Sequence, residues 1–252
     1  MGTDLEAKMS EAAPEPIIVL VHGAFAESAS WNGVISRLTT RGLPVLALAN
    51  PLRSVASDAA YLRDVISGLG RPVILAGHSY GGMVITEAAA EHPAVRALVY
   101  VAAFAPEPGE SALLLSGKFP GSTLGAALTG TPLAAGGTDL SIDVAKFAHQ
   151  FAADVDPGQA ALMAVTQRPV TEQALGDGLS ATDPAWLNVP SWFVWGAADL
   201  NIPAAAMRFM AERAEARESR EIPGASHALS VSEPGAVAET ILAAVTYVRN
   251  EA

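Results

Sequence analysis

Short runs of consecutive apolar residues alternate along the chain with longer segments in which apolar residues recur every three or four positions. Such runs, rich in Val, Ile and Leu, are typical of strands that are buried on both faces of a parallel sheet. A further run with more polar residues has the character expected of an edge strand. The apolar runs lie at residues 16–21, 45–49, 73–76, 95–101 and 191–195, and the more polar one lies at 217–222.

The segments between these runs have the periodicity of amphipathic helices. Ser28 or Ser30 is a candidate N-cap for a helix that passes through Trp31. Strands that alternate with helices predict an α/β fold, with a mostly parallel sheet of about six strands, helices on both faces and right-handed crossovers. Further helices are expected at about 55–69, 83–91, 203–216 and 234–247.

Residues 106–185 interrupt this alternation, because they are rich in Gly, Pro, Ser and Thr and contain no convincing β run. Helical patterns are expected near 113–115, 139–153 and 157–165. A segment of this length is too long for a loop, so it predicts a helical cap inserted after the fourth strand. The expected organisation is a single domain over 16–252 that includes this cap, preceded by a flexible tail at 1–15.

Composition narrows the class of protein. The chain has 252 residues, half of them hydrophobic, which is enough for the core of one large domain. A net charge of −11 disfavours nucleic acid and anionic membrane surfaces as partners. The chain has no cysteine, its first residues lack the apolar stretch of a signal peptide, and no run has a membrane-spanning length. A cytoplasmic protein is expected, and its oligomeric state stays open, with a homodimer as one option.

The candidate chemistry centres on the turn Gly77-His78-Ser79-Tyr80-Gly81-Gly82, between an expected strand and an expected helix. The pattern G-x-S-x-G in this context is the nucleophile elbow, in which a serine is raised on a sharp turn. Glycine neighbours let strand and helix approach each other, and the helix directs its positive end at developing negative charge. A phosphate-binding turn would instead require G-x-G-x-x-G spacing, which is absent. Ser79 is therefore the candidate nucleophile.

A serine nucleophile needs a base and an acid, and both are available at the expected carboxyl ends of strands. His227 can accept the Ser79 proton near neutral pH, and Asp199 can hold the imidazole in the required tautomer. The chain order Ser79, Asp199, His227 is the order of nucleophile, acid and base in α/β-hydrolases. Glu107, after the fourth strand, is a rival for the acid, and Asp183 is a weaker one.

The other histidines are expected to have structural roles. His22 is expected to brace its turn and His78 to pack within the elbow, while His92 lies at a helix end and His149 at the surface of the cap. No His, Asp or Glu cluster has ligand spacing, so no metal site is predicted. The apolar residues that flank the reacting groups in sequence predict an apolar pocket; they are Phe25, Phe104 and Leu200.

Together, the glycine-rich turn with Ser79 and the loops with Asp199 and His227 give the chain a resemblance to the α/β-hydrolase fold superfamily. The resemblance covers nearly the whole length, from Ile17 to about Val248. The resemblance implies an oxyanion hole formed by the backbone N–H groups of Ala24 and Tyr80. The apparent lack of a strand pair before Ile17 is similar to the branch that includes plant methylesterases and hydroxynitrile lyases. The motifs that carry the resemblance are VLVHGAF (19–25), GHSYGG (77–82), WGAADLNIP (195–203) and IPGASHALSVSEP (222–234).

The resemblance implies a carboxylic ester hydrolase that acts on small uncharged esters through an acyl-serine and needs no cofactor. Epoxide hydrolases and haloalkane dehalogenases of this fold use an aspartate at the elbow, which Ser79 argues against. The lyases carry a threonine where this chain has Gly23 and a lysine where it has Ala228. A cofactor-free perhydrolase, a lyase and a receptor-like ligand-binding module with slow turnover remain alternatives.

Overall fold

The computed structural model describes residues 14–90 and 92–251. Its central feature is a six-stranded sheet in which every neighbouring pair of strands is parallel, so the predicted fold class is confirmed. The two edge strands are the second and the last in sequence, and the last is the polar one, as predicted. From edge to edge the strands are β2 (Val45–Leu48), β1 (Ile17–Val21), β3 (Val73–His78), β4 (Val95–Val101), β8 (Ser191–Gly196) and β9 (Glu218–Ile222).

The register of the sheet brings the carboxyl ends of its central strands to one edge. Val21 at the end of β1 pairs with Gly77 of β3, and His78 pairs with Val101 at the end of β4. Gly196 at the end of β8 pairs with Ile222 at the end of β9. The loops that follow these strands carry the candidate site residues, so the register places these loops along the same edge.

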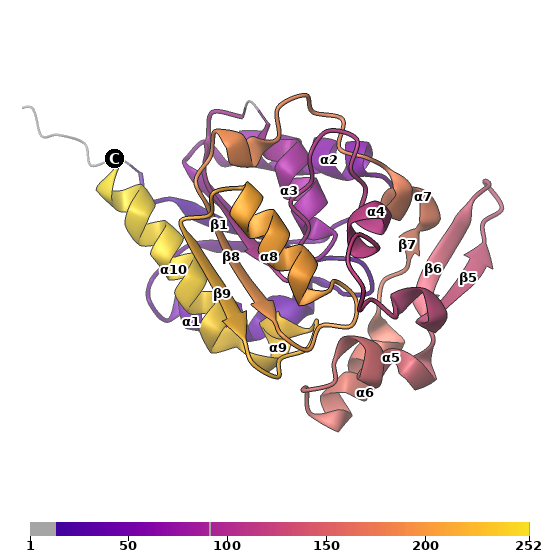
Figure 1. Cartoon of the computed structure of the whole chain (residues 1–252). Helices are drawn as coiled ribbons and strands as arrows, with labels where there is room; N and C mark the ends of the chain where they lie inside the picture. Colours follow the sequence, from indigo (N-terminus) through magenta and orange to yellow (C-terminus); the bar gives the residue numbers. More distant parts are fainter. Residues whose placement is uncertain (1–13, 91, 252) are drawn as a thin grey trace, which may run out of the picture.

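Helices cover both faces of the sheet (Figure 1). Alternate residues of a strand point to opposite faces, so Ile18 and Leu20 pack in one hydrophobic core and Val19 and Val21 in another. The first core includes α1 (Asn32–Thr39) and α10 (Pro234–Asn250). The second core includes α2 (Val55–Leu69), α3 (Gly81–Ala89) and α8 (Ala204–Arg213). None of the helices in the described ranges has the length and apolar character of a membrane span.

Local signals account for some of the helix boundaries. The hydroxyl of Ser54 accepts the N–H of Ser57 at the start of α2, and Gly70 ends that helix in the left-handed conformation with φ 61°. The prediction that Ser28 or Ser30 caps the following helix is wrong. Both serines lie in a 3₁₀ turn, η1 (Ser28–Trp31), and α1 begins after it without a side-chain cap.

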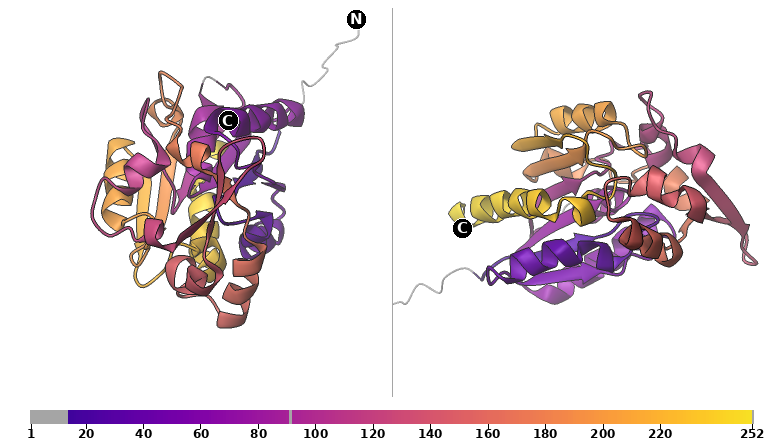
Figure 2. Two further views of the ribbon diagram at one scale, coloured as in Figure 1. Left: turned by 90° about the vertical axis from the view of Figure 1, so that its right-hand side faces the viewer. Right: turned by 90° about the horizontal axis from the view of Figure 1, so that it is seen from below.

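The segment between β4 and β8 adds no strand to the main sheet and gathers at one end of it (Figure 2). It contains helices, as predicted, but also a three-stranded antiparallel sheet, so the expectation that it has no β structure is wrong. Its elements are α4 (Ala112–Ser116), η2 (Leu124–Ala127), β5 (Leu128–Pro132), β6 (Thr138–Ile142), α5 (Val144–Phe151), α6 (Pro157–Thr166), β7 (Val170–Thr171), α7 (Glu172–Gly176) and η3 (Ala185–Leu187). Outside this segment, a short helix, α9 (Leu229–Ser232), follows β9.

The helix expected at 139–153 is therefore strand β6 followed by helix α5. Asp143 separates the two elements, because its side chain accepts the N–H of Ala145 and caps α5. The β5–β6 hairpin turns through Gly136 and Gly137, whose φ angles of 94° and 84° suit glycine. Most side chains of the hairpin are exposed or half-buried, so it lacks the apolar run of a buried strand.

The two ends of the inserted segment lie beside each other. Pro108 forms a β-bridge with Leu179, and Ser111 forms another with Gly178. The carboxylate of Glu87 on α3 accepts the backbone N–H groups at 180 and 181 at 2.9 and 3.1 Å, which ties the exit of the segment to the core. Of the tail predicted at 1–15, residues 1–13 lie outside the described residues.

Candidate active site

Ser79 lies at the apex of the turn between β3 and α3. Its φ of 54° is in the left-handed region that side chains with a Cβ seldom adopt. Its N–H donates to the carbonyl oxygens of Val101 and Ala102 at 3.2 and 3.1 Å, which holds the turn against the end of β4. A Cβ at Gly77 would lie 2.6 Å from the carbonyl oxygen of Gly81, so only glycine allows strand and helix to approach this closely.

His227 and Asp199 form a buried pair. His227 Nδ1 lies 2.6 Å from Asp199 Oδ2, and both side chains are almost completely inaccessible. The other carboxylate oxygen, Oδ1, accepts the N–H groups of Asn201 and Ile202 at 2.7 and 2.9 Å. The carboxylate is therefore fixed by its own loop. Because it accepts the Nδ1–H, Nε2 is the imidazole nitrogen left with a lone pair.

Ser79 and His227 line the same cavity, which has a volume of about 80 Å³. Phe25 and Phe104 also line it, as predicted from their positions in the sequence, whereas Leu200 does not. The carbonyl oxygen of Leu200 instead accepts the N–H of Thr123. The remaining lining residues come largely from the inserted segment: Ala24, Tyr80, Ala112, Leu113, Ser116, Ser122, Leu124, Gly125, Leu128, Leu175, Asn201 and Ile202.

Two backbone N–H groups beside this cavity, those of Ala24 and Tyr80, have no protein acceptor within residues 14–90 and 92–251. The neighbouring N–H of Phe25, by contrast, donates to the carbonyl oxygen of Arg168 at 3.1 Å. The turn before Ala24 lies against the elbow, since a Cβ on Gly23 would be 3.2 Å from the Tyr80 nitrogen. These are the two donors that the sequence predicts for an oxyanion hole.

His22 and His78 support the site as neutral, buried groups. His22 Nε2 accepts the N–H of Asn50 at 3.0 Å, so its Nδ1–H donates to the carbonyl oxygen of Gly23 at 2.9 Å. His78 donates Nε2–H to the carbonyl oxygen of His227 at 2.9 Å. Burial lowers the pKa of His22 to about 4 and that of His78 to about 3. Both therefore position backbone around the site without carrying charge at neutral pH.

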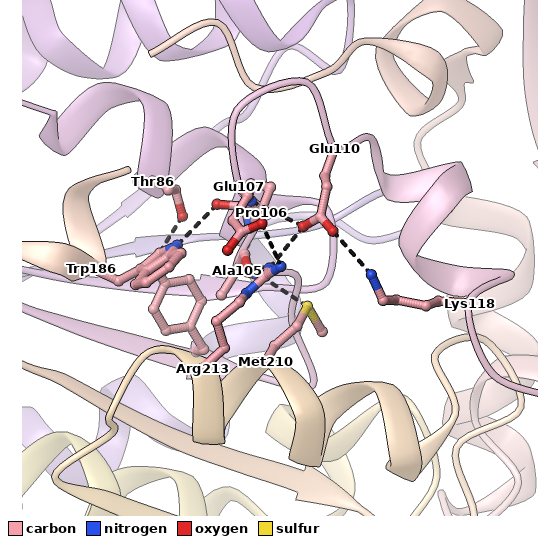
Figure 3. Close-up of polar contacts among 10 residues, drawn as sticks. Thr86, Ala105, Pro106, Glu107, Glu110, Lys118, Trp186, Met210 and Arg213 are labelled. Atoms are coloured by element: carbon pink, nitrogen blue, oxygen red, sulfur yellow. Dashed lines mark hydrogen bonds and ion pairs between the residues drawn. The ribbon is translucent and has the colours of Figure 1, made fainter. Parts of the chain in front are cut away.

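The rival carboxylates lie elsewhere. Glu107 is half-exposed and forms an ion pair with Arg213, Nη1 to Oε2 at 3.4 Å. Figure 3 shows Glu107 and Glu110 around the Arg213 guanidinium, which also donates to the carbonyl oxygen of Ala105 at 2.7 Å. Asp183 is exposed. Among the three candidate acids, Asp199 is the one that is hydrogen-bonded to His227.

One polar contact at the site was not predicted from the sequence. The hydroxyl of Tyr80 donates to Asp58 Oδ2 at 2.9 Å, and both residues are fully buried. Asp58 shares the buried face of α2 with Leu62 and Ile66, at a spacing of four residues. A carboxylate on an otherwise apolar helix face was the available signal, because a buried charge requires polar partners.

Comparisons with known proteins agree with this architecture. The model of the Alpha/beta hydrolase family matches residues 18–240, and the chain belongs to that family. It is 27% identical over 249 residues to the Alpha/beta hydrolase nvfD of Aspergillus novofumigatus, covering 90% of this chain and 95% of that protein. It is 37% identical over 116 residues to the Carbendazim hydrolyzing esterase of Nocardioides sp.. This match covers 40% of this chain and 47% of the length of that esterase.

The fold is also that of a plant protein of known structure. The crystal structure of a methylesterase protein, MES16, from Arabidopsis superposes with a TM-score of 0.77 at 19% identity. The superposition covers 92% of this chain and 99% of that chain. At this level of identity the likeness concerns the fold alone, and it agrees with the predicted α/β-hydrolase fold.

Proposed function

We propose that the protein is a carboxylic ester hydrolase in which Ser79 is the nucleophile, His227 the general base and Asp199 the acid behind it. The observation that carries the proposal is the 2.6 Å contact between His227 Nδ1 and Asp199 Oδ2, behind a cavity that His227 shares with Ser79. Two comparisons support the proposal: the chain belongs to the Alpha/beta hydrolase family, and one of its relatives is an esterase.

In the proposed reaction, Ser79 Oγ bonds to the carbonyl carbon of the ester while its proton passes to His227 Nε2. The carbonyl oxygen becomes an oxyanion that accepts the N–H groups of Ala24 and Tyr80. Donors preset for this charge lower the barrier by about 3 kcal/mol each in comparable sites. Collapse of the intermediate breaks the bond to the alcohol, which takes the proton from His227. Water then attacks the acyl-serine by the same steps and releases the acid.

The cavity favours a small, uncharged ester. Apolar side chains such as Phe25, Phe104 and Leu124 dominate its lining, and its volume of about 80 Å³ leaves room for one small substituent of the substrate. No cofactor is part of the proposed reaction, because the serine, the histidine and the backbone donors supply each step.

The lyase alternative is less well supported. A Cβ on Gly23 would lie 2.6 Å from Ser79 Cβ and 2.7 Å from the carbonyl oxygen of His78. A threonine at position 23, as in the lyases, would therefore push the loop after β1 away from the turn that carries Ser79. Perhydrolysis would use the same serine and histidine, and a receptor-like role would use the same cavity without fast turnover.

The test compares Ser79→Ala with Ser116→Ala, a matched control that removes another serine hydroxyl lining the same cavity. With p-nitrophenyl acetate we expect saturable turnover by the wild type and a fall in kcat of at least about 1,000-fold in Ser79→Ala. Ser116→Ala should stay close to the wild type. Equal turnover by wild type and Ser79→Ala would refute the proposal, and ligand binding without turnover would favour the receptor-like role.

A further inference from the structure

A carboxylate lies directly beneath the residue that follows the proposed nucleophile. Asp58 Oδ2 accepts the hydroxyl of Tyr80 at 2.9 Å, and both residues are buried. Burial raises the pKa of the Tyr80 phenol above its usual value, so the hydroxyl stays protonated and is the donor. The far end of the Tyr80 side chain is thus held by a directed hydrogen bond in the core.

Asp58 is itself held in place by α2 and by the segment before it. Its two carboxylate oxygens lie 3.2 and 3.1 Å from the N–H of Arg53, and Oδ1 lies 3.4 Å from Ser57 Oγ. Burial raises the pKa of Asp58, and these donors act in the opposite direction. A buried carboxylate with this set of donors has one orientation, so it is a fixed reference point for Tyr80.

The same anchor is connected to the inserted segment. The Arg53 guanidinium contacts Asp139 Oδ1 of β6 at 2.7 Å and the carbonyl oxygen of Pro169 at 2.8 Å. The hydroxyl of Thr171 in β7 donates to the carbonyl oxygen of Arg53 at 2.6 Å. The backbone that donates to Asp58 is therefore held between α2 and the inserted sheet.

The backbone of Tyr80 needs such an anchor. It follows Ser79, whose φ of 54° is unfavourable and persists only where the surroundings hold it. The carbonyl oxygen of Ser79, in the same peptide unit as the Tyr80 N–H, accepts the N–H groups of Gly82 and Phe104 at 2.9 and 3.3 Å. The Tyr80 N–H itself has no protein acceptor within residues 14–90 and 92–251, so the contact with Asp58 holds Tyr80 from its side-chain end and complements the bonds to Ser79.

We propose that Asp58 is a positioning residue: through the Tyr80 hydroxyl it holds the Tyr80 backbone in place together with the bonds to the Ser79 carbonyl oxygen, and so strengthens the oxyanion hole. This inference rests on the proposed function, because it assigns Tyr80 a role in that reaction. The competing explanation is that the contact only stabilises the fold, as any buried tyrosine hydroxyl bond does.

The chain offers a matched control for that explanation. Tyr100 is also buried, and its hydroxyl lies 2.8 Å from Thr86 Oγ1 in the core. Tyr80→Phe and Tyr100→Phe each remove one buried hydroxyl and leave the ring. Both should lower the thermal midpoint by a similar amount, but only Tyr80→Phe should affect an oxyanion.

The experiment measures kcat and KM for p-nitrophenyl acetate, and the inhibition constant of phenylboronic acid, which forms a tetrahedral adduct with a serine nucleophile. In Tyr80→Phe we expect kcat to fall about tenfold with KM nearly unchanged, and boronic acid binding to weaken by about the same factor. Tyr100→Phe should keep both values near those of the wild type. Asp58→Asn combined with Tyr80→Phe should be no slower than the slower single variant, because Asp58→Asn weakens and Tyr80→Phe removes the same contact.

Equal kinetics for Tyr80→Phe and Tyr100→Phe would overturn the inference, as would additive losses in the double variant. If Asp58→Asn fails to fold, the pair of tyrosine variants decides the question. Failure of the proposed function gives a different result, equal turnover by wild type and Ser79→Ala, and would remove this inference with it. The Tyr80 variants are therefore compared only against a wild type whose turnover depends on Ser79.

Discussion

Carboxylates follow the neighbouring strands β4 and β8, and the two groups of carboxylates differ in the basic side chain that they contact. After β8, Asp199 meets the imidazole of His227, which borders a cavity. After β4, Glu107 and Glu110 meet the guanidinium of Arg213, which lies over the rings of Trp186 and Phe209. An imidazole can exchange a proton at neutral pH and a guanidinium cannot, so similar geometry favours catalysis in one cluster and anchoring in the other.

The largest expected effect tests the catalytic side of this comparison. Asp199→Asn should lower kcat for p-nitrophenyl acetate by about 10,000-fold, because the amide no longer holds His227 in the tautomer that accepts the Ser79 proton. The matched control is Glu107→Gln, the same change in the rival carboxylate, which should leave kcat near the wild-type value. If Glu107→Gln gave the larger loss, the two clusters would have to exchange roles.

The next effect tests the anchoring side. Arg213→Met should lower the free energy of unfolding by about 2 kcal/mol, since it removes the nearer of two cations beside the largely buried Glu110 and leaves Lys118 at 3.3 Å. The kcat of the folded variant should not change. Arg208→Met on the same helix removes an exposed ion pair with Glu221 and should cost no more than about 0.5 kcal/mol. Urea unfolding of both variants measures the contrast, and equal losses would mean that Arg213 is not an anchor.

The smallest effect concerns pH. Burial raises the pKa of Glu110, but the hydrogen bonds from Arg213, the Glu107 N–H and Lys118 and the charge of Arg213 together outweigh it, so the pKa in the folded protein is below its usual value. A lowered carboxyl pKa gives stability that is present above the unfolded pKa of about 4.3 and is lost as the pH falls through the folded value. The stability difference between wild type and Arg213→Met should therefore be full at pH 7 and shrink below about pH 4. A difference that stays constant in urea unfolding at pH 7, 5 and 3.5 would contradict this.

The part of the fold that the sequence predicts well is the part that is buried on both sides. The runs that became β1, β3, β4 and β8 are almost entirely buried, and a continuous apolar run of this length is typical of a strand inside a parallel sheet. The β5–β6 hairpin was missed for the opposite reason. Its side chains are exposed or half-buried, and Gly130 and Pro132 weaken the strand signal, so the pairing itself determines the structure.

The candidate site divides in the same way. Ser79, Asp199 and His227 were identified because each follows a strand in a motif of local character. The Tyr80–Asp58 contact joins residues 22 apart on different elements, and only the packing of α2 against α3 brings them together. Leu200 was assigned to the pocket from its place in the chain. It follows Asp199, but the turn directs Asn201 and Ile202 to the cavity instead.

The adjacency of Pro108 to Leu179 and of Ser111 to Gly178 has a consequence for how such a protein can diversify. A segment whose two ends meet can be lengthened, shortened or replaced while β4 and β8 keep their places, because the cost of closing a loop changes slowly with its length. The residues between those ends supply much of the cavity wall, including Ala112, Leu124 and Leu175. The cavity wall can thus be exchanged as a module, while Ser79, Asp199 and His227, the proposed catalytic residues, keep their places at the edge of the sheet.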